Sequence, residues 1–171
     1  MPKIIENARE MILSEARRQV MSAGYAATTI RSIAGSCGLA AGTVYNYFPS
    51  KDVMIAAFML EDWQECVRRM KAAESREPEL VMRHIFTCLA DYAKEHETLF
   101  NDPSAKAPYE AAIAGHHGQL RSQIAAIIEP LFDGCEDGGW LAEFAAQSLL
   151  YWTMEGKAFD RIWVALRRVF A

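Results

Sequence analysis

The sequence lacks the features that would place it in a membrane or outside the cell. No apolar run approaches the ~20 residues that a membrane-spanning helix needs. The first residues, MPKIIENARE, are charged and contain no apolar segment of the kind found in a secretory signal peptide. The four cysteines are scattered without a CxxC pair, which favours reduced thiols: Cys37, Cys66, Cys88 and Cys135. We therefore expect a cytoplasmic protein with no membrane partner.

Catalytic and metal-binding patterns are also missing. No nucleophile–base constellation and no pair of carboxylates can be placed together, so an enzyme is not expected. His116 and His117 are adjacent, and adjacent side chains on a helix point ~100° apart, which does not suit chelation. His84 and Cys88 have an i,i+4 spacing, but Cys88 shares an apolar stripe with Ile85, which favours a core position. We expect neither a metal nor a cofactor.

A surplus of positive charge is absent from the chain as a whole but present at its start. The 171 residues carry a net charge of −4. Residues 1–51 hold six Lys or Arg against three Asp or Glu, whereas residues 52–171 hold 12 against 19. A locally positive end on an acidic body suggests a polyanionic partner at that end.

The sequence shows no β-strand alternation, internal repeat or low-complexity tract. Apolar residues instead recur every three or four positions, as at Ile5, Ala8, Ile12, Ala16 and Val20, which is typical of one helix face. The pattern predicts an all-α protein of about eight or nine helices. The expected helices cover 4–23, 29–36, 41–48, 51–75, 78–98, 109–132, 140–155 and 158–170, with loops at 101–108 and 133–139.

Two short helices near the N-terminus, joined by a turn at Gly38, predict a helix-turn-helix unit. A helix that enters the DNA major groove must keep its base-facing side small or hydrogen-bonding. The second of these helices has small residues at its start, Ala41 and Gly42, and Val44 is left to anchor its inner face. Four later side chains offer donors, acceptors or a methyl group: Thr43, Tyr45, Asn46 and Tyr47.

At these residues the sequence resembles the DNA-binding domain of the tetracycline-repressor (TetR) family. The resemblance covers residues 4–55, about a third of the chain. The residues that carry it are Gly24-Tyr25, Thr28-Thr29-Ile30-Arg31, Ile33-Ala34, Gly38-Leu39, Gly42-Thr43-Val44-Tyr45-Asn46-Tyr47-Phe48 and Ser50-Lys51. It implies a helix-turn-helix domain at residues 1–50 and a helical ligand-binding and dimerisation domain at residues 51–171.

The resemblance also implies which residues touch DNA. They are Thr29, Arg31, Ala41, Gly42, Thr43, Tyr45, Asn46, Tyr47 and Lys51. The sequence departs from the family pattern at Ala40, where a capping Ser is common, and at Ser32, where the loss of an acidic residue is expected to weaken a capping box. Purely structural roles stay open for some of these residues: capping for Thr29, packing for Tyr45, and a solvated surface position for Arg31 and Lys51.

The C-terminal two thirds carries no motif that names a ligand. Aromatic side chains with polar tips on facing helices would suit a flat or apolar organic molecule. The candidate ligand contacts are Trp63, Phe86, Tyr92, Tyr109, Phe144 and Trp152, with Met59, Met82 and His84 nearby in the pattern. An apolar stripe on a helix is more often core than pocket, so a core role for each stays open.

The last two expected helices carry a wide apolar stripe that a single layer of helices does not easily cover. Such a surface suggests an isologous interface between two copies. The candidate interface residues are Tyr151, Trp152, Ile162, Trp163, Leu166 and Phe170. The resemblance implies the same arrangement, in which the final two helices of each subunit form a four-helix bundle.

The sequence therefore predicts a homodimeric transcriptional regulator, most simply a repressor released from a near-palindromic operator by a small-molecule ligand. Two other hypotheses stay open. One is a helical enzyme with residual catalysis, which substrate turnover would reveal. The other is a helix-turn-helix module that contacts protein and not DNA. DNA binding with a steep salt dependence would contradict this second hypothesis.

Overall fold

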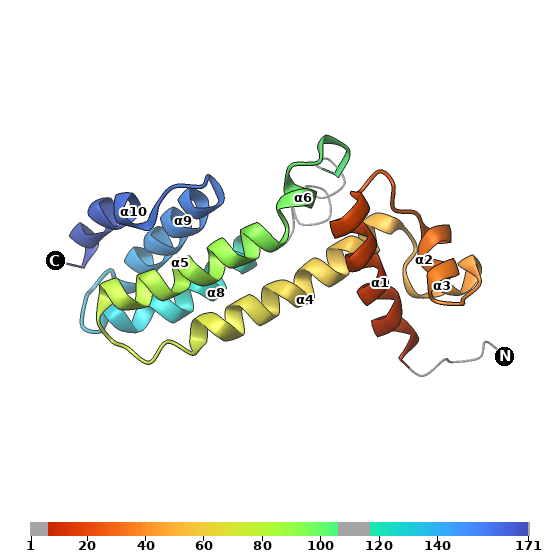
Figure 1. The fold of residues 1–171 in the computed structure, drawn as a ribbon. Helices are drawn as coiled ribbons and strands as arrows, with labels where there is room; N and C mark the ends of the chain where they lie inside the picture. Colours follow the sequence, from red (N-terminus) through yellow and green to blue (C-terminus); the bar gives the residue numbers. More distant parts are fainter. Residues whose placement is uncertain (1–6, 106–116, 171) are drawn as a thin grey trace. The chain divides into compact units, whose positions relative to one another are not determined.

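The computed structural model describes residues 7–105 and 117–170, and this part of the chain is helical with no β-strand. The all-α class predicted from the sequence is confirmed. The elements, traced in Figure 1, are α1 Ala8–Ala23, α2 Ile30–Ser36, α3 Ala41–Tyr47, α4 Lys51–Lys71, α5 Pro78–Glu95, α6 Glu97–Phe100, α8 His117–Ile128, α9 Gly138–Met154 and α10 Phe159–Leu166, with 3-10 turns η1 Glu129–Phe132 and η2 Arg167–Val169. No helix among the described residues is both long and apolar enough to cross a bilayer.

The described residues divide by contact into two compact units. The first unit contains residues 7–62 and 96–105, and the second contains residues 63–95 and 117–170. The first unit thus holds the helix-turn-helix domain expected at residues 1–50, together with the start of α4 and the segment around α6.

The core of the first unit forms where α1 packs against α2 and α6, and α2 packs against α3. Its apolar side chains come from the i, i+3/i+4 positions of each helix, as the periodicity predicts. Burying each larger one contributes about 1.5–3 kcal/mol relative to exposure. The buried set includes Ile12, Leu13, Ala16, Val20, Ile30, Ile33, Ala34, Val44, Phe48, Met54, Ile55 and Phe58.

The second unit is built around α9, which packs against α5, α8 and α10 (Figure 1). The buried side of α9 is small, with Ala142, Ala145 and Ala146 all at 1% exposure or less, which allows close approach of the neighbouring helices. Larger side chains fill the remaining space: Met82, Ile85, Leu89, Ile124, Ile128, Leu149, Ile162 and Leu166.

Several predicted element boundaries are wrong. The helix expected at 51–75 ends at Lys71, and the one expected at 78–98 ends at Glu95, before the separate short helix α6. The helix expected at 109–132 changes to 3-10 geometry at Glu129, where Pro130 lacks the N–H for α-helical bonding. Residues 109–116 of that prediction lie outside the described residues.

The loop expected at 133–139 is shorter because α9 already begins at Gly138. A Cβ at Gly138 would lie 3.0 Å from the carbonyl oxygen of Phe132. The absent side chain therefore lets the first turn of α9 approach the backbone of η1 closely.

Candidate nucleic-acid interface

The helix-turn-helix unit starts with a complete capping box at α2. The Thr29 hydroxyl accepts a hydrogen bond from the Ser32 N–H at 3.0 Å, and the Ser32 hydroxyl accepts one from the Thr29 N–H at 3.1 Å. The expectation that Ser32 weakens this box is therefore wrong, because a serine hydroxyl reaches the N-cap amide as a longer carboxylate would. A cap of this kind stabilises a helix by about 1 kcal/mol. Thr29 has a structural role as well as an exposed position.

The turn between α2 and α3 depends on Gly38. Its φ of +66° lies in the left-handed region that favours glycine. The N–H of Leu39 then donates to the Ala34 carbonyl at 2.8 Å, which closes the end of α2. The chain leaves this turn and enters α3 at Ala41 without a side-chain cap from Ala40. The lack of a cap at Ala40 agrees with the departure noted in the sequence.

On α3 only Val44 is buried, at 0% exposure, and Phe48 just after the helix is 3% exposed. These two side chains fix α3 to the core of the first unit. The rest of the helix is partly or fully accessible, with Gly42, Tyr45 and Asn46 in the exposed class. The predicted α3 residues therefore all lie at partly or fully accessible positions of one short helix: Ala41, Gly42, Thr43, Tyr45, Asn46 and Tyr47.

Four polar side chains of α3 are not engaged by the part of the chain that the structure describes. Among the described residues, no hydrogen bond or ion pair engages the side chains of Thr43, Tyr45, Asn46 or Tyr47, and Tyr45 is 53% exposed. Arg31, on α2, is also exposed. Helix α3 thus carries accessible hydrogen-bond donors and acceptors and has a glycine in its first turn. Such a helix is suited to contact the base edges and the phosphate backbone of a nucleic acid.

Lys51 has an internal role that the sequence did not reveal. Its Nζ donates to the carbonyl oxygens of Tyr25 at 2.8 Å and Thr28 at 3.1 Å, and it lies 3.6 Å from the centre of the Tyr25 ring. Partial burial lowers the pKa of Lys51 below its ordinary value, while Asp52 and Asp102 act in the opposite direction. The predicted phosphate contact of Lys51 stays a prediction beside this internal contact.

In the second unit the candidate ligand contacts fall into separate groups. Trp63 donates through Nε1 to Gln123 Oε1 at 2.8 Å and meets Tyr92 edge to face, with ring centres 5.5 Å apart. Phe86 instead meets Phe159, also at 5.5 Å. Trp63 and Tyr92 are buried, so a core role and a ligand role both stay compatible with their position. The candidate Tyr109 lies outside the described residues.

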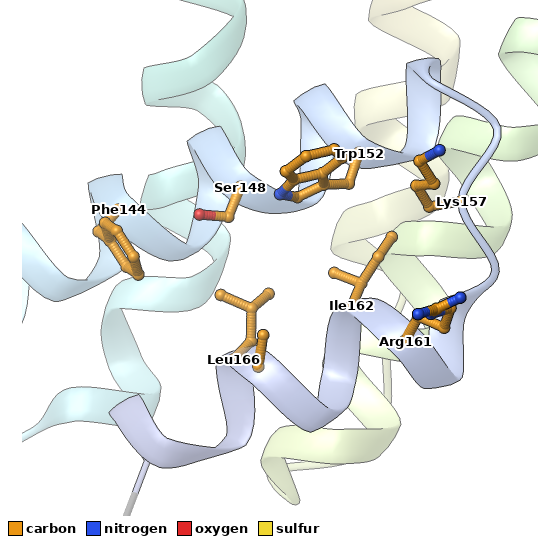
Figure 2. Close-up of a pocket in the computed structure, with 8 residues that line it drawn as sticks. Phe144, Ser148, Trp152, Lys157, Arg161, Ile162 and Leu166 are labelled. Carbon is orange, nitrogen blue, oxygen red and sulfur yellow. The ribbon is translucent and has the colours of Figure 1, made fainter.

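The other two ligand candidates, Phe144 and Trp152, line a groove between α9 and α10 (Figure 2). The groove has a volume of about 510 Å³. Its lining joins these two candidates to the candidate interface residues Ile162 and Leu166. Two cations, Lys157 and Arg161, lie toward one end in Figure 2.

The remaining interface candidates differ in their surroundings. Tyr151 is 50% exposed beside Trp152. Trp163 and Phe170 are half-buried, and Phe170 stacks on Phe132 with ring centres 4.7 Å apart. Both of these side chains therefore take part in the packing of the second unit itself.

Sequence reasoning missed Trp140 and Val164 as surface residues. Trp140 is 67% exposed and stacks on Phe144 at 5.9 Å, and Val164 is 55% exposed on α10. Helical spacing could have identified Trp140, because it lies four residues before Phe144 and eleven before Tyr151, which puts all three on one side of α9. Exposed apolar side chains on α9 and α10 are therefore more numerous than the candidates indicated.

The described part of the chain, 7–105 with 117–170, contains no group of three His, Cys, Asp or Glu side chains placed to hold a metal ion. The pair His84 and Cys88 is engaged within the fold, since His84 Nε2 lies 2.8 Å from the Arg69 carbonyl oxygen. The candidate His116 lies outside the described residues.

A capped helix, a glycine turn and an accessible polar helix together form a helix-turn-helix of the kind that binds DNA. Residues 12–58 match the family of bacterial regulatory proteins called the tetR family. This N-terminal part of the chain is therefore a DNA-binding domain of the TetR family.

Individual relatives agree with this assignment. The chain is 33% identical over 114 residues to the HTH-type transcriptional repressor Rv1474c of Mycobacterium tuberculosis, and 32% identical over 63 residues to the HTH-type transcriptional regulator UidR of Escherichia coli K12. These matches cover 60% and 37% of this chain, but only 59% and 32% of the two relatives. Both relatives are named as regulators of transcription and neither as an enzyme.

The solved structures extend the likeness to nearly the whole chain. The structure of Thermus thermophilus FadR, a TetR-family repressor in complex with lauroyl-CoA, is 27% identical in sequence. It covers 95% of this chain and 92% of its own, with a TM-score of 0.57.

Proposed function

We propose that this protein is a cytoplasmic homodimeric repressor that binds a near-palindromic DNA operator and leaves it when a small-molecule ligand binds. The observation that carries the proposal is the accessible face of α3, where Tyr45, Asn46 and Tyr47 have no hydrogen-bond partner among the described residues. Polar groups that the fold does not use are available for base edges and phosphates.

Recognition by α3 requires that its backbone come close to the duplex. Gly42 lies in the first turn of α3, and no atom lies within 4 Å of the position that a Cβ would occupy. Space at this point accommodates the edge of a base pair in the major groove. We expect the start of α2, with exposed Thr29 and Arg31, to contact phosphate.

The homodimer is supported by the exposed apolar face of α9 and α10. Trp140, Phe144, Tyr151 and Trp152 are 43–67% exposed on α9, and Val164 is 55% exposed on α10. Large contiguous apolar surfaces are unusual on monomers and mark interfaces. We assign the groove in Figure 2 to this interface rather than to the effector. In a dimer, two α3 helices about 34 Å apart would read successive major grooves.

Release by a ligand requires that the ligand bind one conformation of the protein more tightly than the other. Helix α4 begins next to the helix-turn-helix and continues into the second unit, so it is the connection through which such a change would pass. Because the FadR structure contains lauroyl-CoA, acyl-CoA thioesters are the first effector class to test. Trp63, Phe86 and Tyr92 remain the proposed contacts in the described part of the second unit.

The salt dependence of DNA binding tests the proposal. Fluorescence anisotropy with a labelled duplex, measured at rising KCl, should give a linear fall of log K with log salt, because bound phosphates release counterions. A helix-turn-helix that contacts protein instead of DNA would show no binding to duplexes at any salt concentration. Absence of binding by the folded protein without ligand and with lauroyl-CoA would contradict the proposal.

A further inference from the structure

The turn between α1 and α2 is held by side chains from two distant parts of the chain. It runs from Gly24, with φ of +84°, to Thr28, which is 1% exposed and donates through Oγ1 to the Gly24 carbonyl at 2.9 Å. The next residue is Thr29, the N-cap of α2. The orientation of this turn therefore sets where α2 starts and, through the α2–α3 packing, where α3 lies.

The first support comes from the start of α4. Lys51 donates to the Tyr25 and Thr28 carbonyl oxygens, and the Tyr25 hydroxyl donates to Asp52 Oδ1. Burial, together with the hydrogen bond to Asp52, raises the pKa of Tyr25 to about 12, so its hydroxyl stays protonated as a donor. This support lies close to the helix-turn-helix in sequence.

The second support is the Asp102 carboxylate, which follows α6. Its Oδ1 accepts hydrogen bonds from the Ser104 N–H at 2.8 Å and the Ser104 hydroxyl at 2.5 Å. Its Oδ2 accepts a hydrogen bond from the Tyr25 N–H at 3.1 Å. The bonds from Ser104, followed by those from the backbone of Tyr25 and Ala26, hold the pKa of Asp102 below its ordinary value. One carboxylate thus caps the chain at Ser104 and the turn at Tyr25.

The other end of α6 is also fixed inside the first unit. His96, at the N-cap of α6, is 1% exposed, and its Nε2 lies 3.0 Å from Asp62 Oδ2. Asp62 accepts two further hydrogen bonds from Arg17 on α1, at 3.1 and 2.5 Å. Burial would raise the pKa of Asp62, but the bonds from His96 and Arg17 outweigh it and hold the pKa low. The segment 96–102 is therefore anchored at both ends.

This segment directly follows α5, which belongs to the second unit. We propose that Asp102 is a positioning residue for DNA binding, which fastens the segment leaving α5 to the turn in front of α2 and so sets the orientation of the DNA-contacting helices. The inference rests on the proposed function and adds to it a second connection, besides α4, between the second unit and the helix-turn-helix. Asp102 itself makes no contact with DNA in this account.

The substitution Asp102→Asn, compared with a change at Ser104, tests the contact with Tyr25. Asparagine caps helices about as well as aspartate, but it has one acceptor oxygen, so it cannot accept from both Ser104 and Tyr25. The matched control is Ser104→Ala, which removes one bond to Oδ1 and leaves the bond from Tyr25 to Oδ2 intact. Both variants are made in the full chain.

Two readouts are expected to separate the variants. Amide hydrogen exchange measured by NMR should accelerate by about tenfold at Tyr25 in Asp102→Asn, with no change at Leu39, whose N–H donates to Ala34. Affinity for a DNA duplex enriched by in vitro selection with the wild type should fall about fivefold or more in Asp102→Asn and stay within twofold in Ser104→Ala. The slope of log K against log salt should be the same in all three proteins, because no phosphate contact is lost.

Each other outcome contradicts the inference. Unchanged exchange at Tyr25, faster exchange without loss of operator affinity, or a changed salt slope would each overturn the positioning role of Asp102. If the wild type binds the duplex and one of these results is found, only the role of Asp102 is contradicted and the proposed function stands. Failure of the wild type to bind any duplex overturns the proposed function and this inference together.

Discussion

At the scale of single residues, Gly42 is the position where helix propensity and DNA contact make opposite demands. It lies inside α3, is exposed, and has open space around it. Leucine is a better helix former than glycine by about 0.5–1 kcal/mol, so Gly42→Leu should leave the free energy of unfolding unchanged or raise it by that amount. It should weaken operator binding at least about tenfold, because the side chain occupies the space proposed for the duplex.

Urea denaturation and anisotropy titration of the same preparation check the Gly42 prediction. Gly35→Leu is the matched control, since Gly35 is also an exposed helical glycine with open space around it but is no candidate contact. Equal operator affinity in the two variants would mean that α3 does not approach DNA at its first turn.

The Tyr45 hydroxyl allows a second residue-scale prediction. Tyr45→Phe removes one oxygen from a side chain that is 53% exposed and has no partner among the described residues, so stability should change by less than about 0.5 kcal/mol. Operator affinity should fall about fivefold or more, as for the loss of one hydrogen bond to a charged group. Operator affinity equal to that of the wild type would mean that the Tyr45 hydroxyl does not reach the DNA.

Residue roles were predictable where they follow from helical spacing and a local motif. Val44 and Phe48 are four residues apart, a spacing that predicts one buried side of the helix. The structure buries both side chains and leaves the other residues of α3 accessible. The internal contact of Lys51 was not predictable, because its partner Tyr25 lies 26 residues earlier and the pairing depends on the packing of α1 against the rest of the first unit.

At the scale of elements, a hydrogen-bonded group of side chains on α1 should make stability depend on pH. Glu15 on α1 accepts hydrogen bonds from Arg18 at 2.6 and 2.8 Å and from Gln19 at 2.7 Å, and these lower the pKa of Glu15 from 4.5 to about 2. A lowered pKa in the folded state contributes stability that is fully present above pH 4.5 and is lost as the pH falls toward 2.

Glu15→Gln should therefore lower the melting temperature at pH 7, and the difference from the wild type should shrink between pH 4.5 and pH 2. Thermal unfolding followed by circular dichroism at four pH values checks this. Glu10→Gln is the control, because Glu10 is exposed on the same helix without a hydrogen-bond partner in the described residues. A difference that stays constant down to pH 2 would contradict the assignment.

The exposed face of α9 and α10 is the second feature of this scale. Trp152→Glu places a charge where the proposed interface excludes water, so the protein should change from a dimer to a monomer of 19.2 kDa. Light scattering after size exclusion measures the mass directly. Leu80→Glu, on α5 at 49% exposure, should remain dimeric. A wild type that is already monomeric at micromolar concentration would remove the basis for the proposed dimer.

Helix positions were largely predictable from apolar periodicity, whereas their ends were not. The ends depend on single contacts, such as the capping box of Thr29 with Ser32 and the close approach of Gly138 to Phe132. Apolar periodicity does not predict which residues make these contacts, because it says nothing about the distances between their atoms.

At the scale of the whole molecule, the all-α class and the family followed from composition and one dense motif. The grouping of residues 96–105 with the helix-turn-helix did not, since it rests on contacts such as the one between Asp102 and Tyr25, which are 77 residues apart. The candidate ligand contacts were the least predictable, because an aromatic side chain at helical spacing serves a core and a pocket equally well. Trp63 and Tyr92 show this, as they pack on each other in the second unit.

The most direct test of the central claim is an in vitro selection of bound duplexes from a random DNA library at near-physiological salt. The account predicts a palindromic consensus with half-sites about one helical turn apart, one for each α3 of a dimer. The consensus should be lost with Gly42→Leu and retained with Gly35→Leu. Failure of the folded wild type to enrich any sequence would contradict the assignment of α3 as a DNA-reading helix.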